Sequence, residues 1–99
     1  MKSQTDKKEC EDLVSAIHKI NNFQELYDFL EDLCTPAELR SMADRWRVAK
    51  LLSKGISYRN IYDQTGVSTA TITRVARSMT YGSGGYQAAL EKSSIEDNP

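Results

Sequence analysis

The chain has 99 residues, of which 39% are hydrophobic and 27% are charged, and its formal net charge is −1. This balance is typical of a folded globular chain and excludes an intrinsically disordered one. No apolar run approaches the roughly 20 residues that a membrane-spanning helix needs, and the N-terminus has no apolar signal core. We therefore expect one domain over residues 1–99, in a cytoplasmic protein.

The charges are segregated along the chain. Residues 1–35 have a net charge of −4, residues 36–80 have +5, and residues 81–99 have −2. Binding to nucleic acid depends on the local field at the docking surface, so the basic middle segment favours DNA even though the overall pI is about 5.8. The acidic flanks are then expected to lie away from the phosphates.

Two amphipathic helices are predicted within residues 9–33. Apolar residues recur at intervals of three and four from 9 to 20 and again from 23 to 33. Asn22, followed three residues later by Glu25, indicates a capping box at the start of the second helix, whereas residues 1–8 are polar and expected to be frayed. Each helix has more apolar surface than so short a chain can cover, so both are predicted to be dimerisation helices of a homodimer.

A core helix is predicted over residues 36–54. Thr35 is a capping residue, Pro36 suits the first turn, and Glu38 completes a capping box, while Gly55 is expected to end the helix. The remaining faces are basic, and most of these cations are interpreted as solvent-exposed. The apolar side is expected to comprise Leu39, Met42, Ala43, Trp46, Leu51 and Leu52.

Residues 57–80 contain the clearest motif. Ser57 and Ser68 are expected to cap two short helices, over residues 58–65 and 69–79, and Gly66 can adopt the left-handed conformation that turns the chain between them. This pattern predicts a helix-turn-helix whose second helix enters a DNA major groove. The simpler alternative is a plain helical hairpin inside a bundle. Its buried side chains are predicted to be Ile61, Val67, Ile72 and Val75.

Residues 81–99 are interpreted as a hinge and a C-terminal tail. The glycine-rich segment 81–86 lacks the Lys-Ser/Thr of a phosphate-binding loop and favours a flexible hinge. One or two helical turns are expected over residues 87–92, and residues 93–99 are predicted to be disordered.

The residues that could carry catalysis or bind metal are sparse. Cys10, Cys34 and the single His18 have no metal-ligand spacing, and the acidic residues concentrate in the N-terminal helices. No nucleophile–base pair and no carboxylates paired across a pocket are predicted, so the protein is not expected to be an enzyme.

A family resemblance rests on residues of the core helix and the helix-turn-helix. Thr35-Pro36, Arg45, Leu51-Leu52, Gly55, Ser57 and the run 70–74 (ATITR) resemble the tryptophan repressor family, more narrowly its YerC/YecD-type branch, over about residues 34–79. The resemblance implies an all-α, intertwined homodimer of about six helices per chain, with one helix-turn-helix per subunit. It further implies a sequence-specific transcriptional regulator that represses by binding double-stranded DNA, gated in the family by a small ligand.

The match also implies which residues form the sites. In the family two arginines hold the indole ring or carboxylate of tryptophan, and Arg45 and Arg74 match them, with Thr35 and Ser78 matching a threonine and a serine of the pocket. The family's glycine after the second arginine is replaced by Val75, whose branched side chain is expected to lie where the indole would be. The effector is therefore L-tryptophan, a different small ligand, or none. The predicted DNA-binding residues, from this match and from the polar face of the second helix, are Tyr58, Arg59, Tyr62, Ser68, Thr69, Ala70, Thr71, Thr73 and Arg77.

Two alternative functions stay open at this point. One is a DNA-binding domain without a regulatory role, as in a replication initiator or transposase. The other is a helical protein-interaction module whose basic face binds an acidic partner. Salt-dependent binding to duplex DNA would separate the interaction module from both DNA-binding alternatives.

Overall fold

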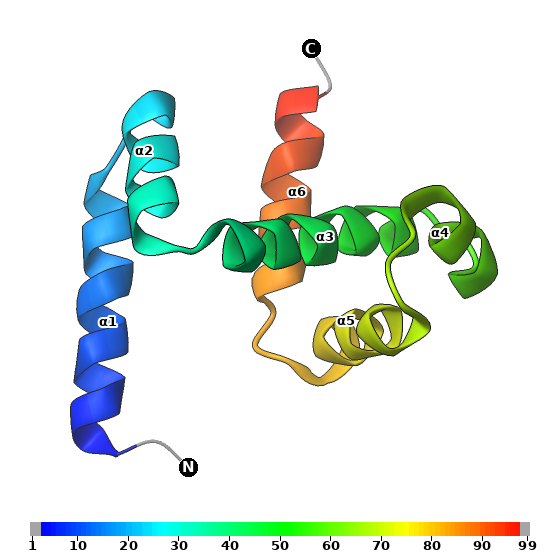
Figure 1. Cartoon of the computed structure of the whole chain (residues 1–99), viewed down its shortest axis with the longest axis horizontal. Coiled ribbons are helices and arrows are strands. Elements are labelled where there is room, and N and C mark those ends of the chain that lie inside the picture. The colour runs from blue at the N-terminus through cyan, green and yellow to red at the C-terminus, as the bar shows by residue number, and fades with distance from the viewer. Residues whose placement is uncertain (1–2, 98–99) are drawn as a thin grey trace. The chain divides into compact units, whose positions relative to one another are not determined.

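The computed structural model describes residues 3–97, with the side chains of residues 3–94, and all secondary structure within it is helical. The prediction of an all-α chain with about six helices is confirmed (Figure 1). No helix within the described range is long and apolar enough to cross a membrane. The helices are α1 (Gln4–Lys19), α2 (Phe23–Leu33), α3 (Pro36–Ser53), α4 (Tyr58–Thr65), α5 (Thr69–Tyr81) and α6 (Gly85–Asp97).

The chain divides into two compact units, Met1–Leu39 and Arg40–Pro99, and each is described by itself. In the first unit no residue of α1 or α2 is buried. Phe23 is 82% exposed and Val14 63% exposed, and Tyr27 and Leu33 are about half exposed. The apolar faces that the sequence predicts on these two helices are therefore at most half-buried within this unit.

α1 begins earlier than the sequence analysis predicts. The Asp6 backbone N–H donates to the Ser3 Oγ at 3.1 Å, and the Ser3 N–H donates to the Asp6 carboxylate at 3.4 Å. This is a capping box, which satisfies two backbone donors at the helix end. The prediction of frayed residues 1–8 is therefore wrong from Gln4 onward, because the aspartate takes the place of the usual glutamate in the capping pattern; Met1 and Lys2 lie outside the described residues.

The start of α3 forms as predicted. The Glu38 N–H donates to the Thr35 Oγ1 at 3.1 Å, and the Thr35 N–H donates to the Glu38 carboxylate at 2.8 Å. The second bond lowers the pKa of Glu38 below its ordinary value, with a further lowering from the Thr35 side chain. α2 begins with the forward bond of its predicted box, from the Glu25 N–H to the Asn22 Oδ1 at 3.0 Å.

We expect Thr35→Ala to raise the pKa of the Glu38 carboxyl part of the way back to its ordinary value. The substitution removes the threonine hydroxyl and loosens the cap, while the backbone donor remains. Since the pKa is lowered in the folded protein, the stabilisation from this carboxylate is present above its unfolded pKa and is lost as the pH falls through the folded pKa. A carboxyl-resolved NMR titration measures the shift, and an unchanged Glu38 pKa in the variant would refute this role of the cap.

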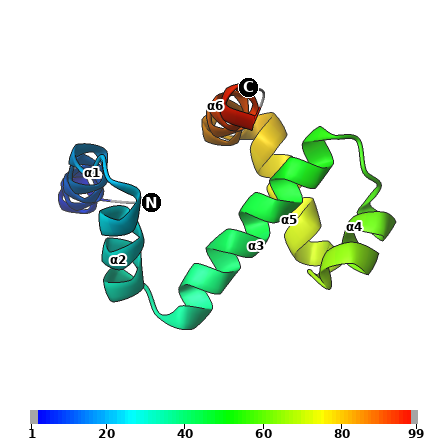
Figure 2. The same ribbon diagram turned by 90° about the horizontal axis from the view of Figure 1, so that it is seen from above.

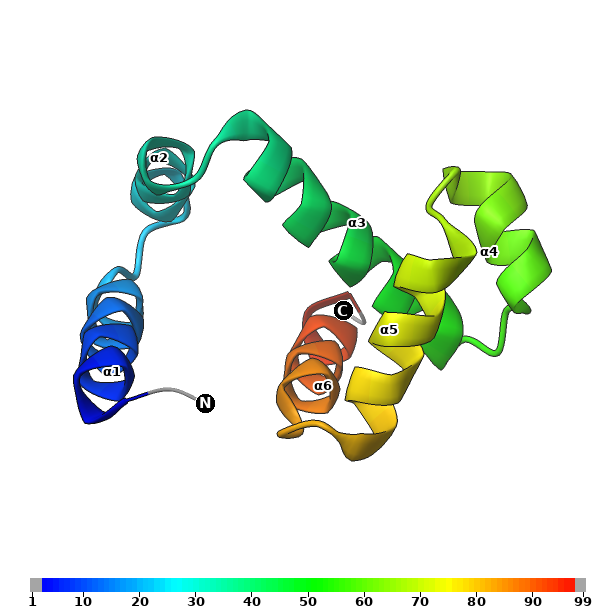
Figure 3. The ribbon, with the colours of Figure 1, turned by 60° about the horizontal axis from the view of Figure 1, so that its bottom comes forward.

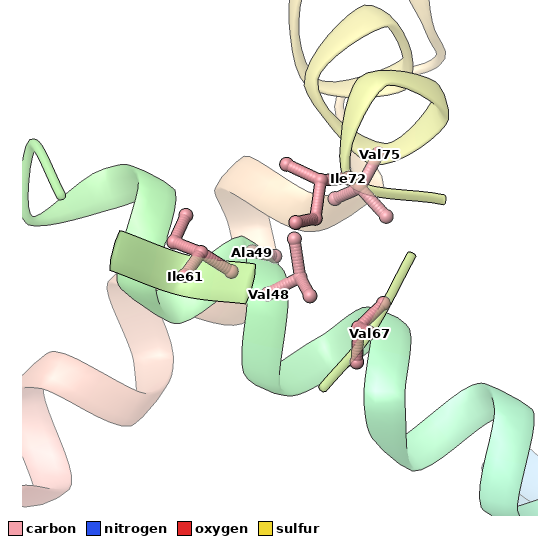
Figure 4. Packing of buried hydrophobic residues seen from close by; sticks show 6 residues of the cluster. All are labelled: Val48, Ala49, Ile61, Val67, Ile72 and Val75. Atoms are coloured by element: carbon pink, nitrogen blue, oxygen red, sulfur yellow. The ribbon is translucent and has the colours of Figure 1, made fainter. Parts of the chain in front are cut away.

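The buried core lies in the second unit, where α3, α4 and α5 meet (Figure 4). Four of its members confirm the prediction for the helix-turn-helix. Val48 and Ala49 of α3 are fully buried although the sequence analysis does not name them, whereas Met42 is 41% exposed. These two residues share a face with Leu52 at spacings of three and four, and that stripe is the signal that the first interpretation of α3 passes over. The buried residues are Val48, Ala49, Ile61, Val67, Ile72 and Val75.

The turn between α4 and α5 has the predicted geometry. Gly66 has φ of 73°, in the left-handed region, and its N–H donates to the Tyr62 carbonyl. The Ser57 Oγ accepts from the Asn60 N–H at 3.1 Å, and the Ser68 Oγ accepts from the Thr71 N–H at 3.2 Å. α5 packs against both α4 and α6, as Figures 2 and 3 show from two sides.

The C-terminal part of the chain is more helical than predicted. α5 continues to Tyr81, and α6 runs from Gly85 to Asp97 in place of the predicted one or two turns. The prediction of a disordered tail is wrong for residues 93–97, and residues 98–99 lie outside the described part. Tyr86 packs against the core and Leu90 is half-buried, so this i, i+4 pair anchors α6.

Candidate nucleic-acid interface

α5 has one buried face and one polar face. Ile72 is fully buried and Val75 is 1% exposed, so the inner face is fixed against α3 and α4 (Figure 4). Thr71 is half-buried, and its hydroxyl lies 3.1 Å from the Ser68 Oγ in the N-cap. The outer face presents hydroxyls, a methyl and two guanidinium groups, all exposed to solvent: Thr69, Ala70, Thr73, Arg74 and Arg77.

α4 presents an aromatic and cationic surface. Tyr58 and Tyr62 are 42% and 50% exposed, one turn apart on the same face. The side chain of Arg59 is 86% exposed and lies 3.7 Å from Asp63, one turn further along α4. An exposed ion pair of this kind contributes little to stability. Arg59 can therefore leave Asp63 for another anion, such as a phosphate.

The positive charge of this surface is largely uncompensated. Among the side chains of residues 3–94 the ion pairs are Arg40–Asp44, at 2.9 Å, and Arg59–Asp63. Arg74 and Arg77 of α5 form no ion pair within that range. These two guanidinium groups create a positive field on the outer face of α5.

The residues matched to the family's ligand pocket have different surroundings. Ser78 lines a hollow of about 510 Å³ together with Trp46 and Tyr86, and neither Arg45 nor Arg74 lines that hollow. Arg45 is half-buried on α3, and Arg74 is exposed on α5. Thr35 belongs to the first unit, where its hydroxyl caps α3.

Val75 is buried, as the sequence analysis predicts for the core of the helix-turn-helix. Its side chain belongs to the core cluster, close to Ile72 (Figure 4).

Within residues 3–97 there is no group of three or more histidine, cysteine or acidic residues that could hold a metal ion. The features that the structure does bring together at this site are a capped turn, a buried inner face and a cationic, hydroxyl-rich outer face.

These features define a helix-turn-helix protein of the DNA-binding class. The family model described as Trp repressor protein matches residues 8–94, and the chain therefore belongs to this family. The resemblance predicted from the sequence is confirmed, and family membership indicates a helix-turn-helix DNA-binding regulator.

Individual relatives agree with this assignment. The uncharacterised protein YerC of Bacillus subtilis (strain 168) is 42% identical over 85 residues, which cover 86% of this chain and 82% of YerC. A TrpR-like protein from Eubacterium eligens ATCC 27750 has a crystal structure that is similar with a TM-score of 0.83 and 42% identity, covering 89% of this chain and 91% of that one. A Staphylococcus aureus protein proposed to be a Trp repressor gives a TM-score of 0.83 at 37% identity, covering 95% and 97%.

Proposed function

We propose that the protein is a transcriptional repressor that binds specific double-stranded DNA sequences as a homodimer. The observation that carries this proposal is the two-faced α5, whose buried Ile72 and Val75 fix its orientation while threonine and arginine side chains cover its outer face. A helix with such an outer face fits the major groove, where short polar side chains reach base edges. Because its target is genomic DNA, the proposed place of action is the cytoplasm.

The predicted contacts divide into two kinds. Thr69, Ala70, Thr71 and Thr73 lie in the first half of α5, and their methyl and hydroxyl groups suit thymine methyls and base edges. The cations and the α4 tyrosines suit phosphates and sugars, which position a protein on the duplex without reading its sequence. The proposed backbone contacts are Tyr58, Arg59, Tyr62, Ser68 and Arg77.

The dimer is supported by the first unit. α1 and α2 bury none of their residues, yet α2 exposes Phe23, Tyr27 and Leu33 on one side. Exposed apolar surface of this extent on a small chain is typical of an interface. We infer that residues 9–33 pack against the same residues of a second copy, which would place two copies of α5 on one duplex.

Binding to a pool of genomic DNA fragments, measured at several salt concentrations, tests the proposal. A strong fall of affinity with salt and enrichment of particular fragments are expected from a sequence-specific regulator. A module for an acidic protein partner would bind duplex DNA weakly and without enrichment. The same titration with and without L-tryptophan tests whether Arg45, Arg74, Ser78 and Thr35 form a tryptophan pocket. Tighter DNA binding with tryptophan would assign it as the effector. Unchanged DNA binding would make DNA recognition independent of tryptophan.

Arg59→Ala is expected to weaken binding to every duplex and to reduce the salt slope by about one unit per protomer, because one phosphate contact is lost. Arg40→Ala is the matched control. Arg40 also faces an aspartate one turn away on its own helix, so both variants remove one charge and one local ion pair. Equal effects of the two substitutions would mean that Arg59 acts only through net charge, and no effect of Arg59→Ala would exclude a phosphate contact.

A further inference from the structure

A second hollow lies in the unit formed by residues 40–99, away from the face of α5 described above. It has a volume of about 600 Å³ and is bounded by the C-terminal half of α3, the end of α4 and the second half of α6. A volume of this size is typical of sites for small molecules. The described residues that line it are Arg47, Lys50, Leu51, Ser53, Lys54, Gln64, Leu90, Ser93 and Ser94.

The lining is strongly basic. Arg47, Lys50 and Lys54 contribute three positive charges, and none of the lining residues that the structure describes is acidic. None of the three forms an ion pair among the side chains of residues 3–94. The three side chains are exposed, so solvent screens their mutual repulsion, but together they create a positive field in the hollow that attracts an anion.

The remaining groups narrow the kind of anion. The Ser93 side chain is half-buried in the lining, and Ser53 donates its own hydroxyl proton to the Lys50 carbonyl at 2.7 Å, which leaves the Ser53 oxygen available as an acceptor. Leu51 and Leu90 supply half-buried apolar surface. Ammonium and guanidinium groups bind phosphate oxygens through short, charge-assisted hydrogen bonds, and the leucines offer contact to the rest of a ligand.

We propose that this hollow binds a small phosphorylated molecule, with Arg47, Lys50 and Lys54 on the phosphate and with Leu51 and Leu90 on its less polar part. The backbone of a duplex is the competing occupant for any basic surface. A duplex backbone would make no contact with the half-buried surface of Leu51 and Leu90, so the lining favours the small molecule.

A hydrogen bond joins the lining of the hollow to the helix-turn-helix. The Arg47 guanidinium donates to the backbone carbonyl of Gln64, in the last turn of α4, at 3.4 Å. A phosphate that draws Arg47 toward itself weakens this long bond and frees the end of α4. This coupling to DNA affinity rests on the function proposed above, whereas binding of the ligand itself does not.

The test titrates the 99-residue chain with inorganic pyrophosphate and monitors binding through its amide NMR spectrum. The ionic strength is held constant with chloride. Saturable shifts concentrated at Arg47, Lys50, Lys54 and Ser93 are expected. Lys50→Gln/Lys54→Gln should weaken pyrophosphate binding about tenfold or more, since two charge-assisted contacts are lost. Lys7→Gln/Lys19→Gln removes the same charge from exposed lysines of α1, outside the lining, and should leave the affinity within about twofold of the wild type, because screened surface charges act weakly.

Two results would overturn the proposal. One is the absence of saturation, or equal weakening in both double variants, in a protein whose amide spectrum shows it to be folded. The other is a loss of DNA affinity in Lys50→Gln/Lys54→Gln without pyrophosphate that matches the loss in Arg59→Ala, which would assign the hollow to the DNA backbone. Because pyrophosphate binding is measured without DNA, its failure is distinguishable from failure of the proposed repressor function.

Discussion

Ile72→Ala is expected to lower the free energy of unfolding by about 2–5 kcal/mol, the usual cost of deleting a buried aliphatic side chain down to its Cβ. Ile72 is fully buried, and it belongs to a core of only six buried residues among those that the structure describes. Small domains are stabilised by about 5–15 kcal/mol in total, so this one change removes a large share. It also removes part of the packing that fixes α5, so DNA binding should weaken with it.

Urea unfolding at a fixed protein concentration measures the effect, because the stability of a dimer depends on concentration. Ile72→Val should cost only about 0.5–1.5 kcal/mol, since a single methyl group is removed. Thr80→Ala, on the exposed side of the same helix, should stay within about 0.5 kcal/mol of the wild type. If Ile72→Ala unfolds at the same urea concentration as Thr80→Ala, the cluster in Figure 4 does not hold the second unit together.

The helix-turn-helix was predictable because its signals are local. The hydroxyls of Ser57 and Ser68 need only the first turn of their own helices, and Gly66 needs only its own backbone freedom. The burial of Ile61 and Ile72 follows from helical spacing alone. Each of these predictions agrees with the structure, and the exposed face of α5 follows as the complement of its buried one.

The parts that the sequence analysis missed depend on contacts between segments. Val48 and Ala49 are buried because they pack against residues of α4 and α5; their spacing with Leu52 is one of several apolar stripes on α3, and only the contacts decide which stripe is buried. α6 extends beyond its weak local pattern because Tyr86 packs against the same core. The basic hollow joins Arg47 to Ser93 across three helices, so it emerges only after the chain has folded.

The proposed ligand pocket shows the same limit at the level of one residue. Matching positions places Val75 directly after Arg74, where the family has a glycine, and helical spacing places it in the core, but a linear match does not decide how a side chain would meet a ligand. In the structure Val75 faces the core, and its exposure of 1% leaves it no part of an open surface. The predicted DNA-binding residues are less affected by this limit because they lie on the outside of short helices, where spacing determines direction.

Phe23→Glu/Tyr27→Glu is expected to dissociate the proposed dimer, raising its dissociation constant by about a hundredfold or more. The two rings lie on one face of α2 with their centroids 6.3 Å apart, and Phe23 is 82% exposed. Within one chain the change therefore removes little packing, and a carboxylate at Phe23 suits the first turn of a helix. In an interface between copies, the same change deletes aromatic contacts and buries charges, and each loss of about 1.4 kcal/mol in affinity is a factor of ten.

Sedimentation equilibrium measures the mass of the species in solution, which is compared with twice the chain mass of 11.2 kDa. Gln4→Glu/Gln24→Glu is the control, because it adds the same charge to exposed positions of the first unit, and Gln24 lies on the polar side of α2, where it donates to Asp28. The control should remain dimeric, while the aromatic variant should sediment as a monomer and bind DNA with one helix-turn-helix at a time. A wild-type monomer would refute the dimer itself, and an aromatic variant as dimeric as its control would move the interface away from this face of α2.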